Sequence, residues 1–202
     1  EPPSETPTNC DQAQFEQARA LHQHGQLQEA ETLYRALLQK YPDDFDLLHL
    51  TGMVQGQLGD LVTAVDLLRQ AIAIDPNNAA AHCSHGNCLK GMNKLAQALE
   101  SYDRALVLRP DDADALSNRG ATLHDLGIYE EALQSYDRAL TIEPQHVQAH
   151  VNRGLTLREL KRPAEALACY DKAMAINPDF ALVHYNRGLA LTELTRYAEA
   201  CV

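Results

Sequence analysis

One residue type recurs at a spacing that could bind another molecule, and it is asparagine. Asn118, Asn152 and Asn186 lie at equal intervals along the chain, and Asn87 comes before them. An asparagine side chain donates hydrogen bonds through its NH2 group and accepts them through its oxygen. A row of such side chains could hold an extended peptide by its backbone, with each hydrogen bond contributing about 1 kcal/mol.

A second cluster suggests metal chemistry. His82, His85 and Cys88 follow one another at steps of three residues, so on a helix they could share a face and bind a metal ion. The alternative is packing, because His150 and His184 recur at the place of His82 in the same 34-residue frame. We expect the packing role and no metal site.

Catalytic motifs are missing from the sequence. It has no glycine-rich phosphate loop after a strand, no nucleophile elbow and no HExxH motif, and its carboxylates are scattered as helix-surface charges are. We therefore expect no enzymatic activity and no cofactor within these 202 residues.

The charge and composition of the chain restrict the classes of binding partner and the cellular compartment that we expect. The formal charge is −11, from 17 Lys and Arg against 28 Asp and Glu, which disfavours nucleic acid and anionic membranes as partners. No segment approaches the roughly 20 apolar residues that cross a bilayer. The five cysteines form no CxxC pair and make a poor disulfide framework. These features indicate free thiols, no membrane partner and a cytoplasmic location.

The elements that must position these side chains follow a strict period. Five prolines, from Pro42 to Pro178, and five glycines, from Gly52 to Gly188, each recur at the same fixed interval as the asparagines. A unit of two helices with this period cannot bury its apolar face alone, so neighbouring units must stack into an all-α solenoid. We expect a flexible leader over 1–10 and an array over 11–202, with repeats at 11–44, 45–78, 79–112, 113–146 and 147–180 and a partial unit at 181–202.

The turn inside each unit is marked less uniformly. Gly25, Gly59 and Gly127 fall just after the first helix, where a left-handed residue ends it. Asn93 suits the same position, whereas Lys161 and Thr195 suit it less. The sixth unit stops a few residues into its expected second helix, from which we expect the natural polypeptide to continue.

The details of the repeat indicate a family. The fourth unit carries Leu116, Gly120 and Leu123 on its first helix, then Ala132 and Tyr136 on its second. This spacing recurs in register over 11–202 and resembles the tetratricopeptide repeat family. The resemblance implies a right-handed superhelix whose first helices line a concave groove, and it makes the recurring tyrosines core residues.

Projected onto that family, the asparagines lie in the groove. The resemblance implies a scaffold for protein–protein interaction that binds an extended peptide there. The expected peptide-binding residues are Asn87, Asn118, Asn152, Asn186, Lys90, His124, Arg158 and Tyr185.

Other functions stay open. The asparagine row is similar to that of O-linked N-acetylglucosamine transferases, so the array could be the substrate-recruiting arm of a larger enzyme with its catalytic domain beyond residue 202. The clamp that binds chaperone tails in this family is disfavoured, because Cys83 and Gln148 stand where two of its three cations would be, and Asn152 takes the place of the third. Self-association through the unfinished last unit is a third possibility.

A charge pattern predicts how neighbouring units pair. Aspartate at the twenty-fifth position of a unit occurs only where arginine follows at the seventh position of the next. In this family those two positions come from packed helices, so we expect pairs that set the register of the units. The pairs are Asp103 with Arg119, Asp137 with Arg153, and Asp171 with Arg187.

Overall fold

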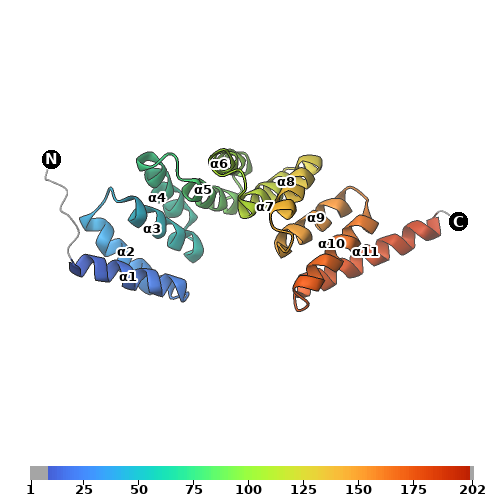
Figure 1. Cartoon of the computed structure of the whole chain (residues 1–202), viewed down its shortest axis with the longest axis horizontal. Helices are drawn as coiled ribbons and strands as arrows, with labels where there is room; N and C mark the ends of the chain where they lie inside the picture. The colour runs from blue at the N-terminus through green and yellow to red at the C-terminus, as the bar shows by residue number, and fades with distance from the viewer. Residues whose placement is uncertain (1–8, 201–202) are drawn as a thin grey trace. The chain divides into compact units, whose positions relative to one another are not determined.

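The computed structural model describes residues 9–200, and every regular element in this range is an α-helix (Figure 1). The chain divides into two compact units, Glu1–Leu108 and Arg109–Val202. Among the described residues, no helix has the length and apolar character to cross a membrane. The prediction of an all-α array of helix pairs is confirmed.

Unit 1 contains three helix pairs. The helices are α1 (Asn9–Gln23), α2 (Leu27–Lys40), α3 (Phe45–Leu58), α4 (Leu61–Ile74), α5 (Ala79–Gly91) and α6 (Leu95–Leu108). Each helix contacts the next in the chain, and α3 also contacts α5. Helix α1 begins at Asn9, so residues 9 and 10 of the expected leader are helical, while residues 1–8 of that leader lie outside the described part.

Unit 2 contains two helix pairs and a longer last helix. The helices are α7 (Ala113–Asp125), α8 (Tyr129–Ile142), α9 (Val147–Glu159), α10 (Pro163–Ile176) and α11 (Ala181–Ala200). Helices α7 to α11 pack in sequence, and the first helices of successive pairs also touch, α7 against α9 and α9 against α11. The first helices therefore form a continuous layer within this unit.

Local sequence explains where several of these helices begin. Asp44 at the start of α3 accepts a hydrogen bond from the Leu47 backbone N–H at 2.9 Å, and Asp112 does the same for Ala115 at the start of α7. A side-chain oxygen at this position satisfies one of the backbone N–H groups that a helix leaves unpaired at its first turn.

The turns within the helix pairs use left-handed residues, as predicted. Gly25, Gly59 and Gly127 have φ of 76°, 92° and 76°, and Asn93 and Lys161 each have φ of 59°. A residue with a Cβ atom pays a steric cost in this conformation, which glycine does not. Lys161 adopts it nonetheless, since the turn between α9 and α10 requires it.

We expect replacement of Lys161 by glycine to stabilise the protein. Glycine removes the steric strain of the left-handed conformation, which stabilises the folded state. Glycine also has more conformational freedom in the unfolded chain, which offsets part of this effect. We expect a net increase of about 0.5–1 kcal/mol in the free energy of unfolding. Equilibrium urea unfolding of Lys161→Gly measures it. Asn93→Gly is the matched control and should gain less, because asparagine tolerates this conformation. A lower unfolding midpoint for Lys161→Gly would show that the turn is not strained.

The sixth unit differs from expectation. Thr195 stands at the turn position, yet α11 runs through it without interruption to Ala200. A β-branched residue is poorly suited to a left-handed turn, and the Thr195 hydroxyl instead donates to the Leu191 carbonyl at 3.0 Å within the helix. The expected separate second helix is therefore not formed within the described residues.

The core of three helix pairs, α5/α6, α7/α8 and α9/α10, has a glycine packed against a tyrosine ring. Tyr102, Tyr136 and Tyr170 are at most 1% exposed, as the repeat predicted. A Cβ atom built on the facing glycine would lie 2.8 Å from the Cε1 atom of Tyr102, 2.6 Å from that of Tyr136 and 2.5 Å from that of Tyr170. The glycines facing these rings are Gly86, Gly120 and Gly154.

Two of the three expected register pairs are confirmed within unit 2. The Arg153 Nε atom lies 2.7 Å from Asp137 Oδ1, and the Arg187 Nε atom lies 2.6 Å from Asp171 Oδ1. Each pair joins the second helix of one unit of the repeat to the first helix of the next. The third pair would join the two compact units of the chain and stays a prediction.

Candidate binding surface on the first helices

The candidate surface is the first-helix face, by which we mean the side chains that α3 and α5 carry in unit 1 and that α7, α9 and α11 carry in unit 2 at the expected groove positions. The layer of touching first helices brings side chains that are one repeat period apart onto neighbouring helices. Asn118, Asn152 and Asn186 thus come from α7, α9 and α11 in turn.

Asn152 is the asparagine best placed to bind another molecule. It is half-buried on α9, and its Oδ1 atom accepts a hydrogen bond from Gln148 Nε2 at 2.9 Å. Its Nδ2 group has no partner within the described part of the chain. The amide oxygen is therefore oriented by Gln148, which leaves two N–H donors for an external acceptor.

Asn186 has a different environment. It is only 4% exposed, its Nδ2 group donates to the Leu182 carbonyl at 2.9 Å, and its Oδ1 atom accepts from Arg158 Nη1 at 3.5 Å. Asn118 is half-buried on α7, where its backbone carbonyl accepts from the Thr122 hydroxyl at 2.8 Å. The row is regular along the chain but its members are not equivalent in space.

Arg158 is held by an acidic partner rather than presented alone. Its Nη2 atom lies 2.5 Å from Glu193 Oε1, and its Nε atom contacts the same carboxylate at 3.2 Å. The hydrogen bond to Glu193 raises the pKa of the Arg158 guanidinium. With Asn186 on its third nitrogen, Arg158 ties α9 to α11 and shapes the face between them.

The two remaining candidates of unit 2 differ in their environment: His124 is hydrogen-bonded within the protein, whereas Tyr185 is exposed. His124 on α7 shares a hydrogen bond with the Thr156 hydroxyl on α9 at 2.9 Å, and its ring lies 5.4 Å from that of Tyr129. Tyr185 on α11 is 65% exposed and Leu182 is 45% exposed. Tyr185 therefore presents an exposed aromatic ring on α11.

The first-helix face of unit 1 has its own depression near Asn87. Met53, Gln57, Ser84 and Asn87 line a cavity of about 230 Å³ between α3 and α5. The Asn87 Oδ1 atom accepts a hydrogen bond from the Tyr102 hydroxyl at 2.7 Å, so the exposed amide is anchored to the core. Lys90 lies near the end of α5, half-buried and with a partner of its own.

Sequence reasoning missed the side chains that hold the candidates in place. Gln148, Thr156 and Glu193 orient Asn152, His124 and Arg158 respectively. One signal was available, because Arg158 and Glu193 are 35 residues apart, as are His22 and Gln57, which share a hydrogen bond at 3.2 Å in unit 1. In both cases a polar residue at the twelfth position of one repeat forms a hydrogen bond with a polar residue at the thirteenth position of the next repeat. Polar residues at these two positions therefore predict the contact.

The histidines considered as metal ligands have protein partners. His82 contacts the Pro76 carbonyl at 3.0 Å and His85 contacts the Ser101 hydroxyl at 3.0 Å. His150 and His184 contact the carbonyls of Pro144 and Pro178 in the same way as His82. Among the described residues, no three His, Cys, Asp or Glu side chains are grouped as metal ligands.

Comparison with known proteins gives a consistent result. The profile described as Tetratricopeptide repeat matches residues 15–79 and 84–147, and the profile described as TPR repeat matches residues 154–194. No curated protein sequence matches the chain.

Solved structures share the fold at low sequence identity. The thermophilic TPR protein TTC0263 of Thermus thermophilus is 23% identical with a TM-score of 0.73, over 90% of this chain and 99% of its own. YrrB, described as a TPR protein with an unusual peptide-binding site, is 23% identical with a TM-score of 0.71, over 92% and 99%. The APC/C hetero-tetramer Cut9–Hcn1 gives a TM-score of 0.81 at 19% identity, over 90% of this chain and 36% of that one.

Proposed function

Because the chain belongs to the tetratricopeptide repeat family, we propose that it is a protein-interaction scaffold whose first-helix face in unit 2 binds an extended peptide segment. The observation that carries this proposal is Asn152, a half-buried amide whose oxygen is fixed by Gln148 and whose NH2 group has no partner in the described chain. An oriented donor without a partner is suited to the backbone carbonyl of a peptide.

The other residues of the face divide by role. Tyr185, exposed on the neighbouring first helix, supplies a rigid aromatic surface for an apolar side chain of the ligand. Asn118 and His124 extend the face along α7, and Arg158, Glu193 and Asn186 set its shape as positioning residues. In unit 1 the cavity at Asn87, with Lys90 nearby, is a separate candidate for peptide binding.

Peptide-binding measurements on variants distinguish residues that contact the ligand from residues that only position them. A random dodecapeptide library displayed on phage and panned on the wild-type chain supplies the probe, and fluorescence anisotropy measures its affinity. Asn152→Asp keeps the shape of the side chain but removes its donors, so we expect binding at least about tenfold weaker, with unchanged helicity by circular dichroism. Asn118→Ala/Asn152→Ala should abolish it.

Two controls make the result specific. Asn77→Ala removes a side-chain amide whose oxygen accepts a hydrogen bond from Arg104, away from the first-helix face, and should leave affinity unchanged. Asn186→Ala should weaken binding together with local stability, because it releases Arg158. Undiminished affinity in Asn152→Asp would place the ligand elsewhere. The role as an arm of a larger glycosyltransferase stays a hypothesis with no further support from the structure.

Self-association through α11 is a second candidate. Leu191 is 40% exposed at the position where Leu157 on α9 is fully buried, so a second copy could cover apolar surface on this side of α11. Self-association of this kind would appear in light scattering as a concentration-dependent dimer that Leu191→Ser removes. A monomer at all concentrations up to about 1 mM, which excludes even weak pairing, would rule the interface out.

A further inference from the structure

One cavity of unit 2 lies away from the first-helix face. It is a groove of about 540 Å³ between α8 and α10, the second helices of two successive pairs, and we call it the second-helix groove. Its walls include Leu140, Thr141, Ala168 and Ile176, and its floor is formed by His150 and Arg153 of α9. Its volume falls within the range typical of ligand sites, about 300–1,000 Å³.

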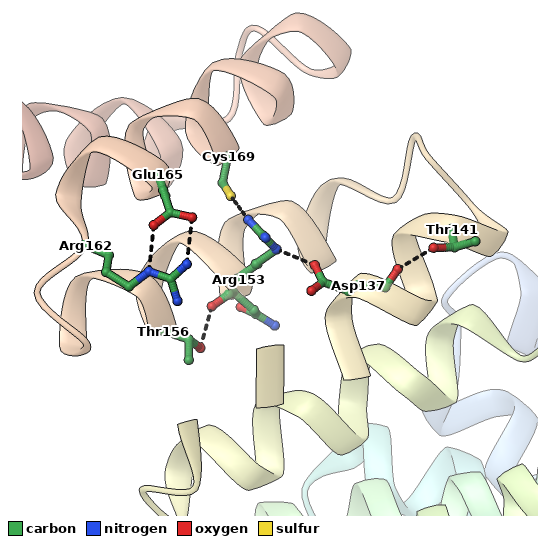
Figure 2. A network of polar contacts seen from close by, with 8 residues as sticks. Asp137, Thr141, Arg153, Thr156, Arg162, Glu165 and Cys169 are labelled. Carbon is green, nitrogen blue, oxygen red and sulfur yellow. Dashed lines mark hydrogen bonds and ion pairs between the residues drawn. The ribbon is translucent and has the colours of Figure 1, made fainter. Parts of the chain in front are cut away.

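The floor of the groove is a charged side chain with part of its bonding capacity unused. Figure 2 shows the Arg153 guanidinium between Asp137 of α8 and Cys169 of α10, with distances of 2.7 Å from Nε to Oδ1 and 2.9 Å from Nη1 to Sγ. The Nη2 atom has no partner within the described residues. Burial raises the pKa of the Cys169 thiol, so the sulfur stays neutral and does not balance the arginine.

A second cation lies on the wall. Lys172 lines the groove from α10 and forms no hydrogen bond or ion pair within the described part of the chain. Asp137 balances Arg153, and burial lowers the pKa of His150, so this ring is neutral at pH 7. The groove therefore has a net charge of about +1 in a chain whose formal charge is −11.

These features identify the kind of partner that the groove fits. We propose that the second-helix groove of unit 2 binds a short peptide segment in which one Asp or Glu is flanked by apolar side chains. The carboxylate would pair with Lys172 and with the open side of Arg153, where charge-assisted hydrogen bonds are stronger than neutral ones. The apolar neighbours would cover Leu140, Ala168 and Ile176.

A groove of unit 1 that shares part of these repeat positions lacks this charge arrangement. It lies between α4 and α6, has a volume of about 410 Å³ and contains Arg69, His85 and Ser101 where unit 2 has Asp137, Arg153 and Cys169. Arg69 is paired with Asp66 on its own helix, and His85 is committed to the Ser101 hydroxyl. We therefore restrict the proposal to unit 2.

The probe is a pool of acetylated, amidated pentapeptides with a central Glu and Ala, Val, Leu, Ile or Phe at the other places. Amide chemical shifts of the 15N-labelled full chain report where the pool binds. We expect saturable shifts at Leu140, Arg153 and Lys172. A matched pool with a central Gln should bind about tenfold more weakly, since it lacks the charge.

Variants confirm the site without loss of the fold. Lys172→Glu should reduce the affinity at least tenfold, and Ala168→Phe should fill the groove and reduce it as well. Both side chains are exposed, so circular dichroism should not change. Arg104→Glu makes the same change of charge on an exposed residue outside the groove and should bind the pool like the wild type.

The proposal fails under three results. The first is the absence of saturable shifts up to about 5 mM peptide. The second is binding of the Glu pool that maps to Asn152 and Tyr185 and is lost in Asn152→Asp, which would support the first-helix face instead. The third is a concentration-dependent shift of Leu140 and Lys172 without peptide, which would identify a second copy of the chain as the occupant.

Discussion

Substitution of Gly154 by alanine is expected to destabilise unit 2 by about 2 kcal/mol or more, although alanine is the better helix former. A Cβ atom at this position would lie 2.5 Å from Cε1 and 2.8 Å from Cζ of Tyr170. The Tyr170 ring is fully buried, so the added Cβ atom would force the ring or the packing of α10 on α9 to shift. The cost of overpacking therefore exceeds the gain in helix propensity.

Gly188→Ala is the matched control, since Gly188 occupies the same place in the repeat on α11. Apart from its chain neighbours and the nearby backbone of α11, no described atom lies within 4 Å of a Cβ built there, so the substitution should stabilise the helix by about 0.5–1 kcal/mol. Urea unfolding gives both values, and hydrogen exchange of α9 and α10 localises the effect of Gly154→Ala. Equal stabilisation by the two substitutions would show that α9 and α10 do not pack as closely as described.

The sequence predicted the features that depend on the backbone and on residue size. A left-handed turn needs glycine or a residue that tolerates this conformation, and a close helix crossing needs a small residue. The residue type alone therefore predicts the turn at Gly127 and the close packing at Gly120. The same holds for the buried tyrosines and for the pairs Asp137–Arg153 and Asp171–Arg187. Recurrence at a fixed period adds the information that a single motif lacks.

The chemistry of the candidate surface was less predictable, because long polar side chains choose among several partners. Asn152 and Asn186 hold the same place in the repeat, yet one keeps its donors open and the other is buried against Arg158. The difference arises from Arg158 and Glu193, which meet only across two helices. The second-helix groove could not be predicted from the sequence for the same reason. Its wall cation, Lys172, matters because it forms no hydrogen bond or ion pair within the described residues, and the sequence does not show this.

The largest loss of stability is expected where an apolar side chain of a first helix is covered by its own second helix. Leu157 on α9 is fully buried, so Leu157→Ala should cost about 2–5 kcal/mol through lost burial and the cavity left behind. Leu191 holds the same position on α11 but is 40% exposed, and Leu191→Ala should cost about 1 kcal/mol or less.

Urea unfolding of the two variants turns this pair into a measurement of what covers α11. Both substitutions remove the same atoms from the same place in the repeat, so their helix propensities and unfolded states are matched and only the cover differs. A cost for Leu191→Ala as large as that for Leu157→Ala would mean that another surface packs on α11 in solution. Combined with a monomeric mass, that surface would belong to the chain itself. In a dimer it would belong to the partner copy, and Leu191→Ser would then separate the copies.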